Sequence, residues 1–139
     1  MTAYVDSSVL LRVVLGQHSG LPEWSRIRHG ISSVLTRVRV FARWIACDCA
    51  VPLTDVELAQ RRSSILRLLD SFELVEIDSL VLDRASQPLP TELGTLDAIH
   101  LATSLLWRES RKTEIVMATH DSALAIAAQS HGFVVVGSS

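Results

Sequence analysis

Apolar and polar residues along the chain form a pattern that predicts strands and helices in turn. Short apolar segments, typical of buried strands, cover residues 3–5, 31–35, 72–77, 115–118 and 133–136. Between them, apolar residues recur three or four positions apart and predict helices over residues 8–15, 23–28, 36–49, 54–70, 80–86, 96–109 and 122–130. The pattern is therefore one of strand and helix units that follow one another.

The helix predicted over residues 96–109 has the clearest apolar face. That face consists of Ala98, Leu101, Ala102, Leu105 and Leu106, and the opposite side carries Asp97, His100, Ser104 and Arg108. We expect His100, on the polar side, to have a structural or supporting role rather than one in proton transfer.

Strands that alternate with helices pair in parallel through right-handed crossovers. The sequence thus predicts an α/β fold, a three-layer α/β/α sandwich with a roughly five-stranded parallel sheet. A length of 139 residues with 48% hydrophobic content fits one domain, residues 1–139, with a substantial core.

Composition narrows the functional classes. No apolar stretch is long enough for a membrane span, and no signal peptide is recognisable at the N-terminus, so we expect a cytoplasmic protein. Cys47 and Cys49 stand too close together for an ordinary disulfide, and no second pair of ligands completes a zinc site, which favours reduced thiols.

Three aspartates stand where a parallel sheet places its functional crevice, at the carboxyl ends of strands. Asp6 and Asp121 each follow an apolar strand and precede a helix, and Asp97 lies in the first turn of its helix behind Thr95, a candidate cap. Each aspartate alone is more simply explained as a helix cap or dipole partner. Together they favour a site for Mg²⁺ or Mn²⁺, which prefer carboxylate oxygen.

The first half of the chain holds a basic stretch, formed by Arg26, Arg28, Arg37, Arg39 and Arg43. These arginines could meet nucleic-acid phosphates, or they could simply form a solvated helix face. The sequence alone favours neither interpretation over the other.

Three segments carry a resemblance to a known family: residues 4–8 (YVDSS), 96–103 (LDAIHLAT) and 118–121 (ATHD). In this order they resemble the PIN domain of VapC-type toxins, and the match spans nearly the whole chain. The resemblance implies an endoribonuclease dependent on Mg²⁺ or Mn²⁺, usually a homodimer, inhibited by a VapB-type antitoxin. It also implies that Asp6, Asp97 and Asp121 are catalytic and hold the metal, which activates water for attack on an RNA phosphodiester.

Arg39 departs from the family pattern, which has a glutamate at this place. Helix physics singles out the same position, because with Thr36 as N-cap a glutamate at residue 39 would complete a capping box. The arginine can be an introduced inactivating change, a naturally degenerate site, or the sign of a helix misplaced by one turn. In the pocket it could pair with a carboxylate and partly replace a cation, without supplying a bound water.

Further residues receive supporting roles. Ser7 and Thr119 could hydrogen-bond metal-bound waters or orient carboxylates, and His120 could approach phosphate. Glu57 is a poor substitute for the missing glutamate because it belongs to the next helix. Trp24, Trp44 and Trp107 fit either a dimer or antitoxin surface or, more often for such residues, the core.

Two rival functions remain. One is an inactive PIN-like module that binds antitoxin or RNA without cleaving, an alternative that Arg39 favours. The other is a small nucleotide-binding or phosphoacceptor protein, but no phosphate-binding glycine loop or nucleophile elbow is present.

Overall fold

The computed structural model describes residues 1–16, 21–46, 53–89 and 91–138. Its five parallel strands form one sheet in the order β3-β2-β1-β4-β5. The strands are β1 (Thr2–Val5), β2 (His29–Ser33), β3 (Glu73–Val75), β4 (Val116–Ala118) and β5 (Val134–Val136). The predicted α/β fold with a five-stranded parallel sheet is confirmed.

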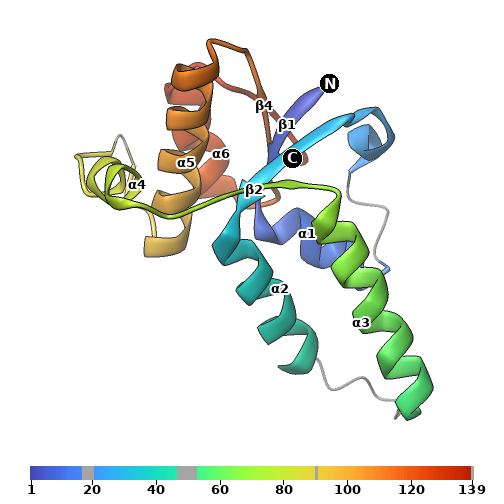
Figure 1. Ribbon diagram of the computed structural model, residues 1–139. Coiled ribbons are helices and arrows are strands. Elements are labelled where there is room, and N and C mark those ends of the chain that lie inside the picture. Colours follow the sequence, from blue (N-terminus) through green and yellow to red (C-terminus); the bar gives the residue numbers. More distant parts are fainter. Residues whose placement is uncertain (17–20, 47–52, 90, 139) are drawn as a thin grey trace.

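Helices cover both faces of this sheet (Figure 1). They are α1 (Ser7–Val14), the 3-10 helix η2 (Pro22–Arg26), α2 (Val34–Ala46), α3 (Asp55–Asp70), α4 (Ser79–Ala85), α5 (Thr95–Arg111) and α6 (Ser122–Ser130). Each predicted helix is present in the described residues, although the one predicted over residues 23–28 is a 3-10 helix that covers Pro22–Arg26. Cys47 and Cys49 lie outside the described residues.

Two apolar clusters show why the sheet is sandwiched. Successive side chains of a strand point to opposite faces. Tyr4 of β1 packs in the cluster that contains Leu101 of α5 and Leu124 of α6. Its neighbour Val5 packs in the cluster that contains Leu10 of α1 and Val40 of α2. The core therefore has two halves, one on each face, as in the predicted three-layer sandwich.

Helix α2 begins two residues earlier than the sequence predicts, at Val34. Ser33 Oγ accepts a hydrogen bond from the backbone N–H of Leu35 at 3.2 Å, so the cap lies at the end of β2. Thr36 is a fully buried residue inside the helix, and its Oγ1 accepts a bond from Ser32 Oγ at 2.8 Å. The prediction of Thr36 as N-cap is wrong, and with it the capping-box argument about Arg39.

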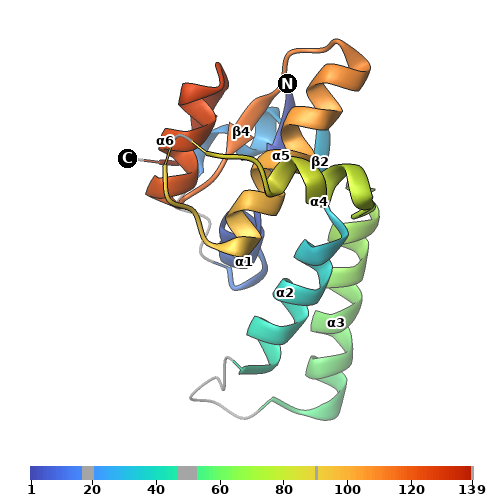
Figure 2. The same cartoon turned by 90° about the vertical axis from the view of Figure 1, so that its left-hand side faces the viewer.

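Helices α2 and α3 both extend away from the sheet (Figure 2). They are in contact at Arg62, whose guanidinium lies 5.0 Å from the centre of the Phe41 ring. Within the parts of the chain that the structure describes, no helix is long and apolar enough to cross a membrane.

The strand order decides where a site can form. Strands β2 and β3 follow β1 in one direction, whereas β4 and β5 extend from its other side. The order thus reverses between β1 and β4, and ligands of such sheets bind in the crevice beyond this reversal, at the carboxyl ends of the strands. Asp6 directly follows β1, and Asp121 comes shortly after β4.

Candidate active site

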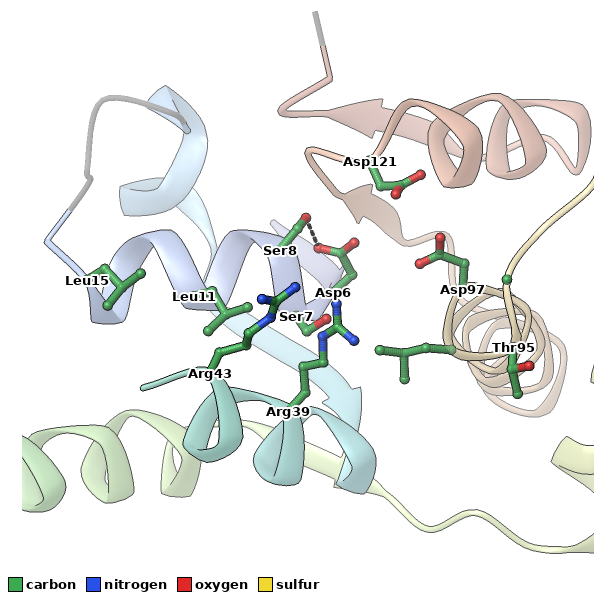
Figure 3. A pocket seen from close by; sticks show the side chains of 12 residues that line it. Asp6, Ser7, Ser8, Leu11, Leu15, Arg39, Arg43, Thr95, Asp97 and Asp121 are labelled. Atoms are coloured by element: carbon green, nitrogen blue, oxygen red, sulfur yellow. Dashed lines mark hydrogen bonds between the residues drawn. The ribbon is translucent and has the colours of Figure 1, made fainter. Parts of the chain in front are cut away.

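A pocket of about 690 Å³ opens at this reversal of strand order. Figure 3 shows that Asp6, Asp97 and Asp121, from three different parts of the chain, line one side of it. Arg39 and Arg43 reach in from α2 on the opposite side. The convergence of three distant acids that the sequence predicts is therefore present in the structure.

Asp6 is held by a dense set of hydrogen bonds. It is the N-cap of α1, and its Oδ1 accepts from Ser8 Oγ at 2.6 Å and from the Val9 N–H at 3.2 Å. Its Oδ2 accepts from Thr119 Oγ1 at 2.6 Å. Only 2% of the surface of Asp6 is exposed, and donors from α1 and from the segment after β4 hold its carboxylate in position.

Thr119 joins the ends of the two strands. While its hydroxyl donates to Asp6, its Oγ1 accepts from the Asp121 N–H at 3.0 Å. The His120 N–H donates to Ser8 Oγ at 3.0 Å, which adds a second link between the same two segments. Thr119 and Ser8 thus both hydrogen-bond the Asp6 carboxylate, and no sequence motif had marked Ser8.

Asp121 is the N-cap of α6, with Oδ1 accepting from the Leu124 N–H at 2.9 Å. Asp97 is the third residue of α5, whose N-cap is Gly94 and not the predicted Thr95. Burial and then the negative charges of Asp121 and Asp6 together raise the pKa of Asp97 to about 6, against the opposing charge of Arg39. The pocket therefore concentrates negative charge around Asp97.

Arg39 is the sixth residue of α2, and its guanidinium points into the pocket (Figure 3). Although its charge acts on Asp97, it forms no ion pair within 4.0 Å with any residue that the structure describes. The family resemblance placed residue 39 in this site, and Arg39 does line the pocket, although the capping-box argument for the same position does not hold. Glu57, at the start of α3, does not line the pocket.

Comparison with known proteins identifies the family. The model of the PIN domain family matches residues 3–130. The chain belongs to the PIN-domain family. It is also 36% identical over 104 residues to Ribonuclease VapC46 of Mycobacterium tuberculosis (strain ATCC 25618 / H37Rv), a match that covers 73% of this chain and 72% of that protein. This PIN domain is of the VapC type.

A solved structure, a toxin-antitoxin complex from Klebsiella pneumoniae, has a similar fold. The TM-score is 0.60 at 17% sequence identity, and the match covers 89% of this chain and 91% of that one. At this identity the likeness supports the PIN fold and nothing finer.

The side chains of this PIN domain suit a hard divalent cation. Three carboxylates face one pocket, and the charges of Asp121 and Asp6 act together with burial to raise the pKa of Asp97, although Arg39 opposes them. Among the described residues, no three His, Cys, Asp or Glu side chains are placed to hold one ion together. Mg²⁺, however, is usually held by one or two carboxylates and several waters, a set that Asp97 and Asp121 can provide.

His100 occupies a different place from the predicted one. The residue is fully buried, and its Nδ1 lies 2.6 Å from the hydroxyl oxygen of Tyr4. Burial lowers the pKa of His100 to about 4, so the ring is neutral at physiological pH. Because α5 packs against α4, α6 and β2, its predicted polar side is buried at His100 and Ser104. The expected structural role of His100 fits this burial.

The remaining predicted residues divide between the pocket and its surroundings. Ser7 lines the pocket. His120 does not, and its Nδ1–H donates to the Gly137 carbonyl at 2.7 Å. Of the tryptophans, Trp107 is buried in the core, while Trp24 and Trp44 are half-buried against it. Leu11, Leu15 and Arg43 also line the pocket, and no sequence motif had marked the two leucines.

Proposed function

We propose that this PIN domain is a metal-dependent endoribonuclease toxin of a type II toxin-antitoxin system, with activity reduced by Arg39. The observation that carries the proposal is the meeting of Asp6, Asp97 and Asp121 in one pocket beyond the carboxyl ends of β1 and β4. The relative named as a ribonuclease supports the choice of RNA as substrate.

The three aspartates have separate tasks in this proposal. Asp97 and Asp121 would hold the Mg²⁺ or Mn²⁺ ion. Asp6, to which the resemblance also assigns the metal, is fixed in the same pocket by Thr119 and Ser8. When bound, such an ion lowers the pKa of a water and stabilises charge on the phosphodiester during hydrolysis. Three donors hold the Asp6 carboxylate in one orientation before any ion binds.

Arg39 weakens this arrangement by placing a positive charge where a divalent cation would be attracted. A guanidinium can neutralise part of the carboxylate charge, but it presents no coordinated water and no Lewis acidity. Reduced metal affinity, rather than misfolding, is therefore the expected cause of low activity.

The second candidate is a PIN module that binds antitoxin or RNA without cleaving. The same Arg39 favours it, because a cation built into the acidic pocket can make the site independent of metal. The two candidates differ in one measurable property, which is turnover that stops when metal is removed.

A reversion experiment tests the proposal. Cleavage of fluorescently labelled RNA is followed with Mn²⁺ and with EDTA for the native chain, for Arg39→Glu, and for the double variant Arg39→Glu/Asp97→Asn. Arg39→Glu should raise Mn²⁺-dependent cleavage by at least about tenfold, the size expected for restoring one charged group at such a site. Cleavage should stop in EDTA and in the double variant. If Arg39→Glu neither binds Mn²⁺ more tightly nor cleaves RNA, the nuclease proposal fails and the binding module is favoured.

Partners follow from the same proposal. We propose a VapB-type antitoxin as a partner, which the structural neighbour described as a toxin-antitoxin complex supports. We also propose a second copy of the chain, which the resemblance to VapC-type toxins implies. A toxin that cleaves cellular RNA acts in the cytoplasm, so we place the protein there. Light scattering of the purified chain alone tests the homodimer.

A further inference from the structure

The pocket continues beyond the three aspartates. Along α1 it is lined by Leu11 and Leu15, one helical turn apart, and from α2 by Arg43. Figure 3 shows these side chains together, on the far side of Asp6 from Asp97. The cavity thus has an acidic end and a second end that combines apolar surface with one positive charge.

The two arginines of α2 that line the pocket, Arg39 and Arg43, differ in what they act on. They are four residues apart and so point to the same side of the helix. Arg39 acts electrostatically on Asp97, but Arg43 is not among the charges that affect the pKa of this aspartate. Arg43 is exposed and, within the described residues, belongs to no ion pair within 4.0 Å. Arg39 is also exposed and also forms no such ion pair, but its charge acts on Asp97, so Arg43 is the cation at the end of the pocket away from the aspartates.

We propose that Arg43 binds the phosphate next to the one that is cleaved, and that Leu11 and Leu15 contact the adjoining nucleoside. The inference rests on the proposed function and names the residues that position its substrate. A guanidinium pairs well with a phosphate through two parallel N–H···O bonds, and apolar side chains can contact the face of any base. A single-stranded RNA would then cross the pocket from Arg43 to the aspartates.

Single-stranded RNA fits this end of the pocket better than an acidic peptide does. Leu11 and Leu15 give this end an apolar surface that a base can contact, whereas an acidic peptide would interact only with the charge of Arg43. Because the cavity is continuous, one strand can also occupy both ends, with one phosphate at Arg43 and the next beside the aspartates.

Binding of a labelled eight-nucleotide single-stranded RNA, measured by fluorescence anisotropy in EDTA over a range of KCl concentrations, tests the phosphate contact. The full chain is compared with Arg43→Ala, Arg43→Lys and Arg37→Ala. Arg37 is the matched control because it lies exposed on the same helix but outside the pocket. Arg43→Ala should weaken binding about five- to tenfold at low salt and reduce the salt slope by about 0.7, the value for one phosphate on a single strand.

The conservative variant should behave differently from the alanine variant. Arg43→Lys keeps the charge, so the native salt slope should return, and Arg37→Ala should stay close to the native chain in both measures. If Arg37→Ala and Arg43→Ala lose RNA affinity equally, general surface charge explains the binding and the proposal is overturned. It is also overturned if the native chain binds no RNA, or if Arg43→Ala impairs only the binding of a polyglutamate peptide.

A second measurement tests the nucleoside contact. Leu15→Ala, checked for native circular dichroism, should weaken binding of the RNA but not of an eight-unit ribose-phosphate oligomer that lacks bases. Equal weakening for both oligomers would refute the leucine contact. Cleavage by Arg39→Glu, measured in parallel, separates the two proposals: if this variant cleaves RNA while Arg43→Ala binds like Arg37→Ala, only the present inference fails.

Discussion

Replacing Asp97 by asparagine should stabilise the metal-free protein at neutral pH. Burial, followed by the charges of Asp121 and Asp6, raises the pKa of Asp97 to about 6 in the folded state. In the unfolded chain an aspartate titrates near about 3.9. The ionised side chain is therefore less favourable in the folded protein than in the unfolded one. This penalty is absent below about pH 4, grows between about pH 4 and 6, and is complete above.

The size of the effect follows from the shift. Two pH units correspond to about 3 kcal/mol at most, since one unit is about 1.4 kcal/mol. Asp97 is only half-buried, so solvent screening reduces the penalty to about 1 kcal/mol. For a chain of this length, Asp97→Asn should then raise the Tm by about 3 °C at pH 7.5.

Thermal unfolding followed by circular dichroism in EDTA checks this prediction. The matched control is Asp83→Asn, which removes an exposed aspartate of α4 outside the pocket. The gain for Asp97→Asn should vanish at pH 4, where the native carboxyl group is protonated. Excess Mn²⁺ should stabilise the native chain more than the variant, because the variant loses a ligand. A lower Tm for Asp97→Asn at pH 7.5, or an equal gain at pH 4, would refute the reasoning.

Two further predictions concern the core and the strand ends. Tyr4→Phe removes the 2.6 Å contact with His100 and should cost about 1–3 kcal/mol in urea unfolding, whereas Ser104→Ala, which loses a bond to a carbonyl of its own helix, should cost less than about 1 kcal/mol. Equal costs would contradict a special role for the buried pair. Gly137→Ala should lower the Tm more than Gly16→Ala, because both have positive φ but only the first would place a Cβ 2.8 Å from a backbone carbonyl oxygen. Equal losses would show that strain alone matters.

Much of the fold could be predicted because strand and helix periodicities are local properties of the chain. Residues 122–130 were predicted as a helix with the observed bounds. The start of α2 was wrong because Ser33 and Thr36 both carry hydroxyl groups able to cap a helix. Packing decides between them, since Thr36 is fully buried and accepts a bond from Ser32.

The burial of His100 also lay beyond local pattern. A helix with one apolar face predicts one buried side, but α5 is flanked by α4 and α6 as well as by the sheet. Its polar side is therefore covered too, and His100 meets Tyr4, a residue 96 positions away in the chain. No periodicity within residues 96–109 contains that information.

The candidate site divides in the same way. The sequence alone was enough to select the three aspartates, to place them after strands or in a first helical turn, and to mark the arginine at residue 39 as unusual. Only the tertiary structure decided that β1 lies beside β4, so that Thr119 can bond Asp6 and Arg43 can share a pocket with Leu11. The physical reason is that local side-chain patterns determine which segments become strands, whereas the packing of distant segments determines which strands become neighbours.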